Sequence, residues 1–220
     1  MSRWLKEKKI VMEAAQRMLA KGLVIGTAGN VSLRLPPEGN SQLLAITPSA
    51  LPYDSLSVDD IQIIDFNTRT VEGNLRPSTE MKLHMGIYRA REEINAVIHT
   101  HSVFASAVSI TGKDIPPILN DQVAFLGGTI KLAEYAPAGS QELATNAVSA
   151  LEDRNAVLLA NHGAVGIGRT MDDAFTACEL IEKTAKIYLL ALSTGTVNHL
   201  PDIAIEAEKA YYDMLRKESE

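Results

Sequence analysis

Asn95-Ala-Val-Ile-His-Thr-His101 is a segment in which a β-branched apolar run leads into two histidines spaced two residues apart. We predict a buried strand over residues 95–99, because β-branched residues pack well on a pleated surface. In extended backbone, residues i and i+2 point to the same side, so the imidazoles of His99 and His101 are predicted to converge on one point. The segment thus predicts a strand inside a sheet with a polar site at its end.

A third histidine lies at another predicted strand end. Residues 156–160 and 164–167 are predicted strands, and Asn161-His162-Gly163 separates them. Three neutral imidazoles with an open fourth position are a common catalytic zinc arrangement, which Mn²⁺ or Co²⁺ can also occupy. Histidines with this spacing also occur as surface or hydrogen-bonded core residues, so the pattern leaves a structural interpretation open beside the metal site.

Hydrophobic periodicity and capping residues predict further helices and strands on both sides of these segments. The predicted helices cover residues 4–19 (closed by Gly22), 77–91, 140–153, 170–193 and 202–216. The predicted strands cover residues 43–47, 61–66, 70–71 and 130–135, with a short one after the glycine-rich turn at 26–30, and residues 102–110 fit a helix or a strand. Because the strands occur in clusters, we predict one layered α/β domain over residues 1–220 with a largely antiparallel sheet.

Composition argues against several classes of protein. With 46% hydrophobic and 22% charged residues, the 220-residue chain is expected to form an ordinary globular domain. Its formal net charge is −6 without a dense cluster of Lys or Arg, which argues against nucleic acid or anionic membranes as partners. No apolar run reaches the ~18 residues of a membrane span, and the N-terminal residues do not resemble a signal peptide. With a single cysteine, Cys178, and so no internal disulfide, we expect a cytoplasmic protein.

Pro77-Ser78-Thr79-Glu80 has the pattern of a helix start, with proline at the entrance, hydroxyls for capping and an early acid. A carboxylate in the first turn of a helix complements the helix dipole, which gives Glu80 a structural interpretation. If the fold brings Glu80 beside the histidines, its carboxylate could instead serve as a metal ligand or general base.

Short polar residues on tight turns form a further candidate group. Glycine loops with exposed N–H groups and helix N-termini both favour anions, so together they could hold a phosphate or a carboxylate. Turns are rich in such residues for local reasons as well, and each member is weak evidence alone. The group consists of Thr27, Gly29, Asn30, Ser49, Ser78 and Thr79.

Five segments in a fixed order resemble the class II aldolase/adducin superfamily, and within it the L-fuculose-phosphate aldolases and related short-chain sugar-phosphate aldolases. The likeness covers about residues 5–215. The segments are Gly26-Thr-Ala-Gly-Asn-Val-Ser32, Ile46-Thr-Pro-Ser49, Pro77-Ser-Thr-Glu80, His99-Thr-His-Ser102 and Asn161-His-Gly-Ala164.

The resemblance implies a three-layer α/β/α fold around a mostly antiparallel sheet, assembled as a homotetramer with active sites between subunits. It implies a divalent metal, first of all Zn²⁺, on His99, His101 and His162, with Glu80 as acid/base and as a ligand in the absence of substrate. The turn residues named above would bind the substrate's phosphate. The implied reaction cleaves a ketose 1-phosphate into dihydroxyacetone phosphate and an aldehyde through a metal-stabilised enediolate.

The sequence departs from the aldolase pattern in two places. Ala50 stands where a glycine is usual, near the expected phosphate site. The tyrosine that the aldolases carry after an Ile-Pro segment is absent from residues 115–123, where Asp121 is the candidate replacement, since related epimerases use an aspartate in this region. Asp121 also fits a surface turn. A catalytic tyrosine near the C-terminus matches Tyr212 or Tyr211, and both also fit the packing of a terminal helix.

Three functions follow from the resemblance. The leading interpretation is a lyase that acts on a small sugar phosphate or a related hydroxy-carbonyl compound. A metal-dependent epimerase, dehydratase or decarboxylase is the alternative, because these reactions share the enolate, and Asp121 favours it. A non-catalytic, adducin-like binding module is the minor alternative. Such modules are expected to lack the three histidines, whereas this sequence has all of them.

Overall fold

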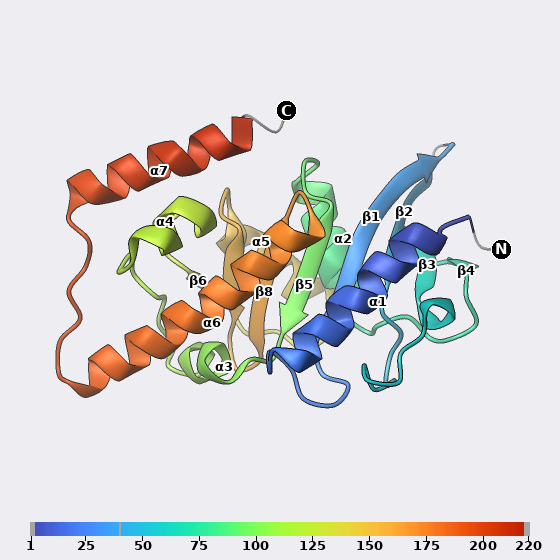
Figure 1. Cartoon of the computed structure of the whole chain (residues 1–220), viewed down its shortest axis with the longest axis horizontal. Coiled ribbons are helices and arrows are strands. Elements are labelled where there is room, and N and C mark those ends of the chain that lie inside the picture. Colours follow the sequence, from blue (N-terminus) through green and yellow to red (C-terminus); the bar gives the residue numbers. More distant parts are fainter. Residues whose placement is uncertain (1–2, 40, 218–220) are drawn as a thin grey trace.

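The structure is a computed structural model that describes residues 3–39 and 41–217. Within these residues, eight strands form one sheet in the order β4-β3-β2-β1-β5-β8-β7-β6 (Figure 1). Neighbouring strands are antiparallel except for the parallel pair β6 and β7. The strands are β1 (Asn30–Glu38), β2 (Ser41–Ile46), β3 (Gln62–Asp65), β4 (Thr70–Glu72), β5 (Ala96–Thr100), β6 (Lys131–Ala133), β7 (Ala156–Leu159) and β8 (Gly163–Gly168).

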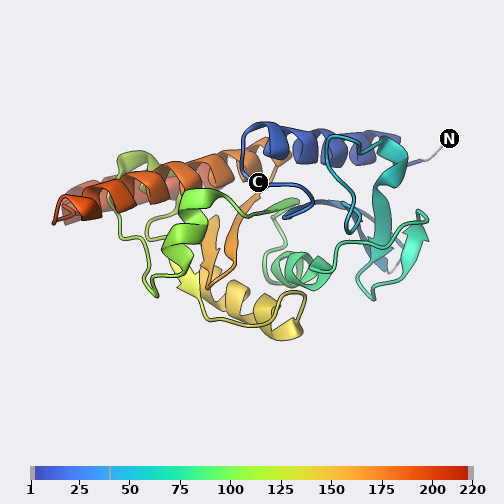
Figure 2. The same cartoon turned by 90° about the horizontal axis from the view of Figure 1, so that it is seen from below.

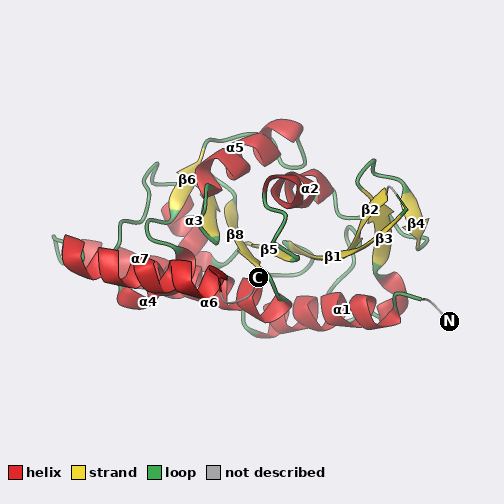
Figure 3. Ribbon diagram, turned by 90° about the horizontal axis from the view of Figure 1, so that it is seen from above, coloured by secondary structure: helices red, strands yellow, loops and turns green. Residues whose placement is uncertain are grey.

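Helices cover both faces of this sheet. Figures 2 and 3 show α1 and α6 on one face and α2 and α5 on the other, so the chain has the predicted three-layer α/β/α architecture. The helices are α1 (Leu5–Ala20), α2 (Met81–Ala90), α3 (Val103–Ser109), α4 (Asn120–Leu126), α5 (Gln141–Leu151), α6 (Met171–Ser193) and α7 (Asp202–Lys217), with a 3-10 turn η1 (Val58–Asp60).

The alternation of side chains in the central strands explains the two cores. On β2, Leu43 and Ala45 pack against the α1 face, whereas Leu44 and Ile46 pack toward α2. Since helices cover both faces, four consecutive apolar residues are buried rather than every second one. On β8, a Cβ at Gly166 would lie 2.6 Å from Cys178 Sγ, so the small residue lets α6 lie directly on the sheet.

Two local predictions about helices are settled by the structure. Residues 102–110, which fit either helix or strand, contain α3. The helix predicted over residues 170–193 is α6, which Thr170 caps in a reciprocal capping box with Asp173. Among the described residues, no helix is long and apolar enough to cross a bilayer.

One helix start was predicted too early, and one helix was missed. α2 begins at Met81, because the Oγ of Ser78 accepts from the backbone N–H of Glu80 in the turn before the helix, and Glu80 itself occupies the N-cap position. α4 was not predicted, because a seven-residue helix after Pro116-Pro117 shows too little periodicity.

Candidate metal centre

The three histidines meet at one edge of the sheet. His99 lies on β5, His101 follows the end of that strand, and His162 immediately precedes β8. β5 and β8 are antiparallel neighbours in which Thr100 pairs with Ala164. The end of β5 therefore lies beside the beginning of β8, which brings His162 to His99 and His101 although it is at least 61 positions away in the sequence. His99 and His101 converge, as their spacing of two residues predicted.

The imidazoles are in mutual contact. Ring centroids are 4.7 Å apart for His99 and His101, 4.7 Å for His99 and His162, and 4.9 Å for His101 and His162. The Nε2 atoms of His99 and His101 are 2.9 Å apart. With Glu80, these residues offer four ligand atoms that all lie within 4.8 Å of one another.

Glu80 reaches the cluster from the entrance of α2 on the neighbouring layer. Its Oε2 lies 3.1 Å from Nε2 of His99 and accepts a hydrogen bond of 2.8 Å from Nδ2 of Asn30. Its Oε1 lies 3.4 Å from Nε2 of His162. The carboxylate is buried, so its position reflects the fold rather than solvation of a helix end.

The donor set fits a divalent metal. Nδ1 of His99 donates to the carbonyl oxygen of Ala164 at 2.9 Å, which leaves the lone pair on Nε2 facing the cluster. Buried Oε1 of Glu80 has no hydrogen-bond donor among the described residues, which is costly unless a cation occupies the space beside it. Three imidazoles and one carboxylate are ligands that zinc and similar metals accept.

The charges of the side chains in the cluster also favour a divalent metal ion. Burial opposes ionisation of Glu80, but His99, His162 and Asn30 outweigh it and hold its pKa well below its usual value. Burial disfavours the charged form of His99, yet Glu80 raises its pKa. Burial and repulsion by the other two imidazoles lower the pKa of His101 to about 4. The ionised Glu80 and the neutral His101 are in the state that a metal ligand requires, and the raised pKa of His99 reflects the negative charge of Glu80, which a bound cation would compensate.

The turns predicted to bind an anion lie next to this cluster. The N–H of Ser78 donates to the carbonyl of Thr47, and the N–H of Ser49 donates to that of Arg76, so residues 47–49 run beside 76–78. The glycine turn joins them through the bond from the N–H of Val31 to Oγ1 of Thr47. The structure thus brings together the three segments that carry Thr27, Gly29, Ser49, Ser78 and Thr79.

Gly29 and Ala50 show how tightly these turns are built. Gly29 has φ +72°, and a Cβ there would lie 2.5 Å from the carbonyl oxygen of His99. Only glycine therefore lets the turn approach the end of β5. Ala50 has φ +60°, a left-handed conformation that glycine adopts at lower steric cost than alanine.

Asn30 has a use that its place in the turn did not reveal. Its amide donates to Glu80, and its Oδ1 contacts Nε2 of His84, a buried histidine on α2 for which no role was predicted. Asn30 is thereby linked to the acid/base candidate in addition to the anion site for which it was predicted. The available signal was the helical spacing of Glu80 and His84, which places both on one side of a helix start.

Asp121 lies outside the cluster. It is in the first turn of α4 and forms an ion pair with Lys183 on α6. Within the described part of the chain, the metal-ligand group consists of Glu80 and the three histidines alone. A role for Asp121 thus stays a prediction that requires the aspartate to reach the site of another subunit.

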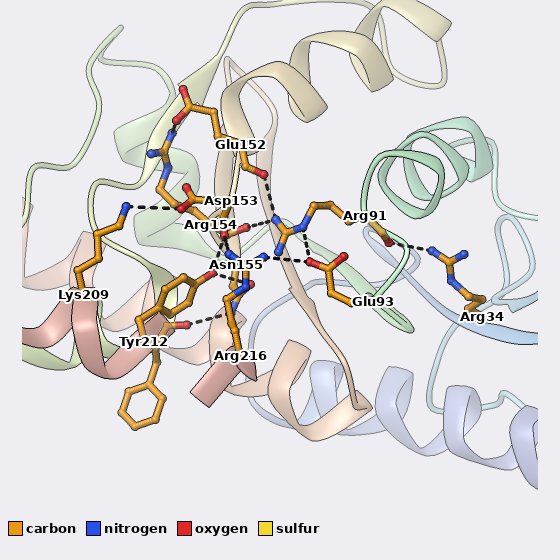
Figure 4. Close-up of polar contacts among 11 residues, drawn as sticks. Arg34, Arg91, Glu93, Glu152, Asp153, Arg154, Asn155, Lys209, Tyr212 and Arg216 are labelled. Atoms are coloured by element: carbon orange, nitrogen blue, oxygen red, sulfur yellow. Dashed lines mark hydrogen bonds and ion pairs between the residues drawn. The ribbon is translucent and has the colours of Figure 1, made fainter. Parts of the chain in front are cut away.

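Tyr212 is held in the packing of α7. Its ring is 2% exposed, and its hydroxyl donates to the carbonyl of Asp153 at 2.6 Å and lies 3.1 Å from Oδ1 of Asn155 (Figure 4). Arg216 and Lys209 on the same helix also bind Asp153. In this position the Tyr212 hydroxyl is occupied, and its role as a catalytic residue stays a prediction.

Tyr212→Phe tests the packing role directly. We expect the free energy of unfolding to fall by about 1 kcal/mol, because the variant removes a buried hydroxyl that donates to the carbonyl of Asp153. Urea unfolding followed by circular dichroism measures this change. Tyr211→Phe is the matched control: Tyr211 is 42% exposed, so the expected change is within about 0.5 kcal/mol. An unchanged stability in Tyr212→Phe together with a large loss of turnover would support the catalytic role instead.

Comparison with known proteins places these features in context. The family described as Class II Aldolase and Adducin N-terminal domain matches residues 9–189. A 5-deoxy-D-ribulose 1-phosphate aldolase of Bacillus thuringiensis serovar kurstaki is 36% identical over 201 residues, which cover 91% of this chain and 92% of that protein. An L-fuculose phosphate aldolase of Escherichia coli K12 is 38% identical over 202 residues, which cover 90% of this chain and 91% of that protein.

A solved structure agrees with the computed fold. An L-fuculose 1-phosphate aldolase superposes with a TM-score of 0.88 at 34% sequence identity, covering 97% of this chain and 98% of that one. The agreement extends over nearly the whole length of both chains, so the sheet and its helical layers are shared.

Proposed function

Because the chain belongs to the family of class II aldolases and adducin N-terminal domains, we propose that it is a metal-dependent lyase that cleaves a ketose 1-phosphate into dihydroxyacetone phosphate and an aldehyde. The observation that carries the proposal is the meeting of Glu80 with His99, His101 and His162. It places an acid/base group beside a metal site in a chain whose full-length relatives are named sugar-phosphate aldolases.

The three histidines and Glu80 have different proposed roles in the reaction. A divalent metal held by the three histidines would stabilise the negative charge that develops on the substrate oxygens as the C–C bond breaks. The Glu80 carboxylate would take up the proton that the substrate hydroxyl loses as it becomes the aldehyde carbonyl, and would pass a proton to the carbon from which the aldehyde departs. The condensation direction reverses both transfers. Burial of Glu80 excludes competing water from this proton transfer.

The turns would hold the substrate's phosphate. Hydroxyls of Thr27, Ser49, Ser78 and Thr79 are the proposed donors, and Gly29 allows the first turn to approach the site closely. Asn30 remains a candidate phosphate ligand, although its amide also supports Glu80. A phosphate fixed here would orient the adjoining carbonyl toward the metal, which is how binding energy remote from the reacting carbon assists catalysis.

The finer features follow from the resemblance. We propose Zn²⁺ as the metal, with Mn²⁺ or Co²⁺ as alternatives, and a cytoplasmic homotetramer with sites between subunits. Leu190, Leu192 and Ile203 support an assembly, because they expose apolar surface at the end of α6 and the start of α7. In such a tetramer we propose Asp121 and Tyr212 as further catalytic candidates. Analytical ultracentrifugation measures the subunit number.

The alternative is an epimerase, dehydratase or decarboxylase on the same scaffold. Asp121 favours it, because this residue stands in the region where the aldolases carry a tyrosine. An adducin-like binding module is a weaker alternative, since the chain keeps a complete set of metal-ligand candidates.

A product assay separates these functions. The purified protein, supplied in turn with Zn²⁺, Mn²⁺ and Co²⁺, is incubated with ketose 1-phosphates, unphosphorylated ketoses and hydroxy acids. We expect metal-dependent release of dihydroxyacetone phosphate from at least one ketose 1-phosphate, and its loss after chelation. Turnover of another substrate without dihydroxyacetone phosphate would support the alternative. Absence of both metal binding and turnover would support a binding module.

A further inference from the structure

A chain of buried polar side chains leads from Glu80 into the space between β1 and α2. Asn30 donates to Oε2 of Glu80 at 2.8 Å and contacts His84 through its Oδ1. Nδ1 of His84 lies 2.6 Å from Oγ of Ser32, and that Oγ lies 2.8 Å from the hydroxyl of Tyr88. Each of these side chains is buried, and His84, Ser32 and Tyr88 have no exposed surface.

The backbone explains why the four side chains beyond Glu80 meet. Asn30 and Ser32 are two residues apart on β1 and therefore point to the same face of the sheet. His84 and Tyr88 are four residues apart on α2 and therefore lie on one side of that helix. The two pairs interleave where α2 packs on the sheet, and Glu80 stands one turn before His84.

The direction of every hydrogen bond follows from the Glu80 carboxylate. Because an ionised carboxylate only accepts, Asn30 must present its NH₂ group to Glu80 and its oxygen to His84. That oxygen only accepts as well, so Nε2 of His84 carries the proton. Nδ1 of a neutral imidazole then accepts from the hydroxyl of Ser32. The Ser32 oxygen accepts from the hydroxyl of Tyr88, which shares its proton with the carbonyl oxygen of Asn95 at 3.3 Å.

The imidazole of His84 is suited to this place because it is neutral. Burial and the nearby His99 lower the pKa of His84 to about 3. A neutral imidazole is a donor on one side and an acceptor on the other, which the two neighbours require. A side chain that only donates or only accepts would leave a buried partner unpaired.

We propose that His84 is a positioning residue for the acid/base carboxyl, acting through Asn30. With its oxygen held by His84, the Asn30 amide cannot turn over and face Glu80 with an oxygen. Oε2 of Glu80 is therefore fixed by a donor, whereas Oε1 faces His162 without a hydrogen bond and is the oxygen left to hold the metal or move the proton. The inference rests on the proposed function, because it assigns His84 a part in the use of the same carboxyl.

Two substitutions at His84 separate positioning from packing. Glutamine is long enough to place an amide donor where Nε2 stands, so His84→Gln is expected to keep the bond to Asn30. Asparagine is shorter and reaches only the Nδ1 position, so His84→Asn is expected to lose it. We expect kcat to fall about 10–100-fold in His84→Asn with KM changed by less than about threefold, and to recover to within about fivefold of wild type in His84→Gln.

A spectroscopic readout makes the test independent of turnover. In ¹⁵N-labelled protein, His84 is expected to show a protonated Nε2 and an unprotonated Nδ1. In Co²⁺-loaded protein, the visible absorption spectrum is expected to change in His84→Asn and to match wild type in His84→Gln, because the spectrum reports the ligand geometry. Ser32→Ala serves as a second route if His84→Asn does not fold. It removes the donor to Nδ1 and with it one of the two hydrogen bonds that hold the imidazole, so a fall in kcat and a changed Co²⁺ spectrum are expected.

The outcomes distinguish the inference from the function on which it rests. If wild type binds Co²⁺ and cleaves a ketose 1-phosphate, but His84→Asn and Ser32→Ala both keep the wild-type kcat and Co²⁺ spectrum, the positioning role is overturned. Equal losses of kcat in His84→Asn and His84→Gln overturn it too. If wild type cleaves no ketose phosphate, the proposed function fails, while the ¹⁵N and Co²⁺ measurements still decide whether His84 orders the carboxyl.

Discussion

Glu80→Gln is expected to lower kcat by about 10²–10⁴-fold while the divalent metal stays bound. Glutamine has the same shape, and its amide oxygen can still accept from Asn30. It carries no negative charge and cannot exchange a proton with carbon. The three histidine nitrogens remain, and three protein ligands are enough to hold a catalytic metal.

Metal analysis beside steady-state kinetics checks this prediction. Glu142→Gln is the matched control, since Glu142 is exposed in the first turn of α5 and the same charge is removed there. The control is expected to retain wild-type kcat and metal content. If Glu80→Gln turned over at close to the wild-type rate with its metal in place, the carboxyl would have no part in proton transfer.

The fold could be predicted from the sequence wherever burial alone decides the local structure. Apolar runs within residues 95–99 and 156–160 indicated strands, and the helical period that begins at residue 170 indicated α6. α3 was ambiguous and α4 was missed, because a seven-residue helix shows too few turns for its periodicity to be distinguished from a strand's. Such helices are determined by tertiary packing rather than by their own sequence.

The candidate site shows a similar division. The period of two along a strand was enough to place His99 and His101 together, and the glycine-flanked strand end supplied His162. The residues around Glu80 favoured a helix-dipole role for its carboxylate. The packing of α2 near the ends of β5 and β8, which brings Glu80 to the histidines, is a tertiary contact that the local sequence does not reveal. The same long-range packing joins Asn30 to His84, a contact that neither segment encodes alone.

His162→Ala is expected to abolish metal-dependent stabilisation and to lower turnover by more than about 10²-fold. A metal that binds only the folded chain stabilises it by about 2.7 kcal/mol when present at 100 times its Kd. For a chain of this length each kcal/mol raises Tm by about 2–4 °C, so wild type should gain about 5–11 °C on addition of metal. Removing one of three imidazoles weakens the site, and this gain should disappear.

The effect can be separated from damage to the fold because His162 is at the surface of the cluster. Its side chain is 15% exposed and belongs to none of the three hydrophobic core clusters, so its removal from the metal-free protein takes no side chain out of the core. His199→Ala is the matched control, since it removes an exposed histidine outside the cluster and should keep both the metal-induced rise in Tm and turnover. Differential scanning calorimetry with and without Zn²⁺ measures these shifts. An equal rise in Tm for wild type and His162→Ala would place the metal elsewhere, because a ligand to the metal cannot be removed without changing the free energy of binding.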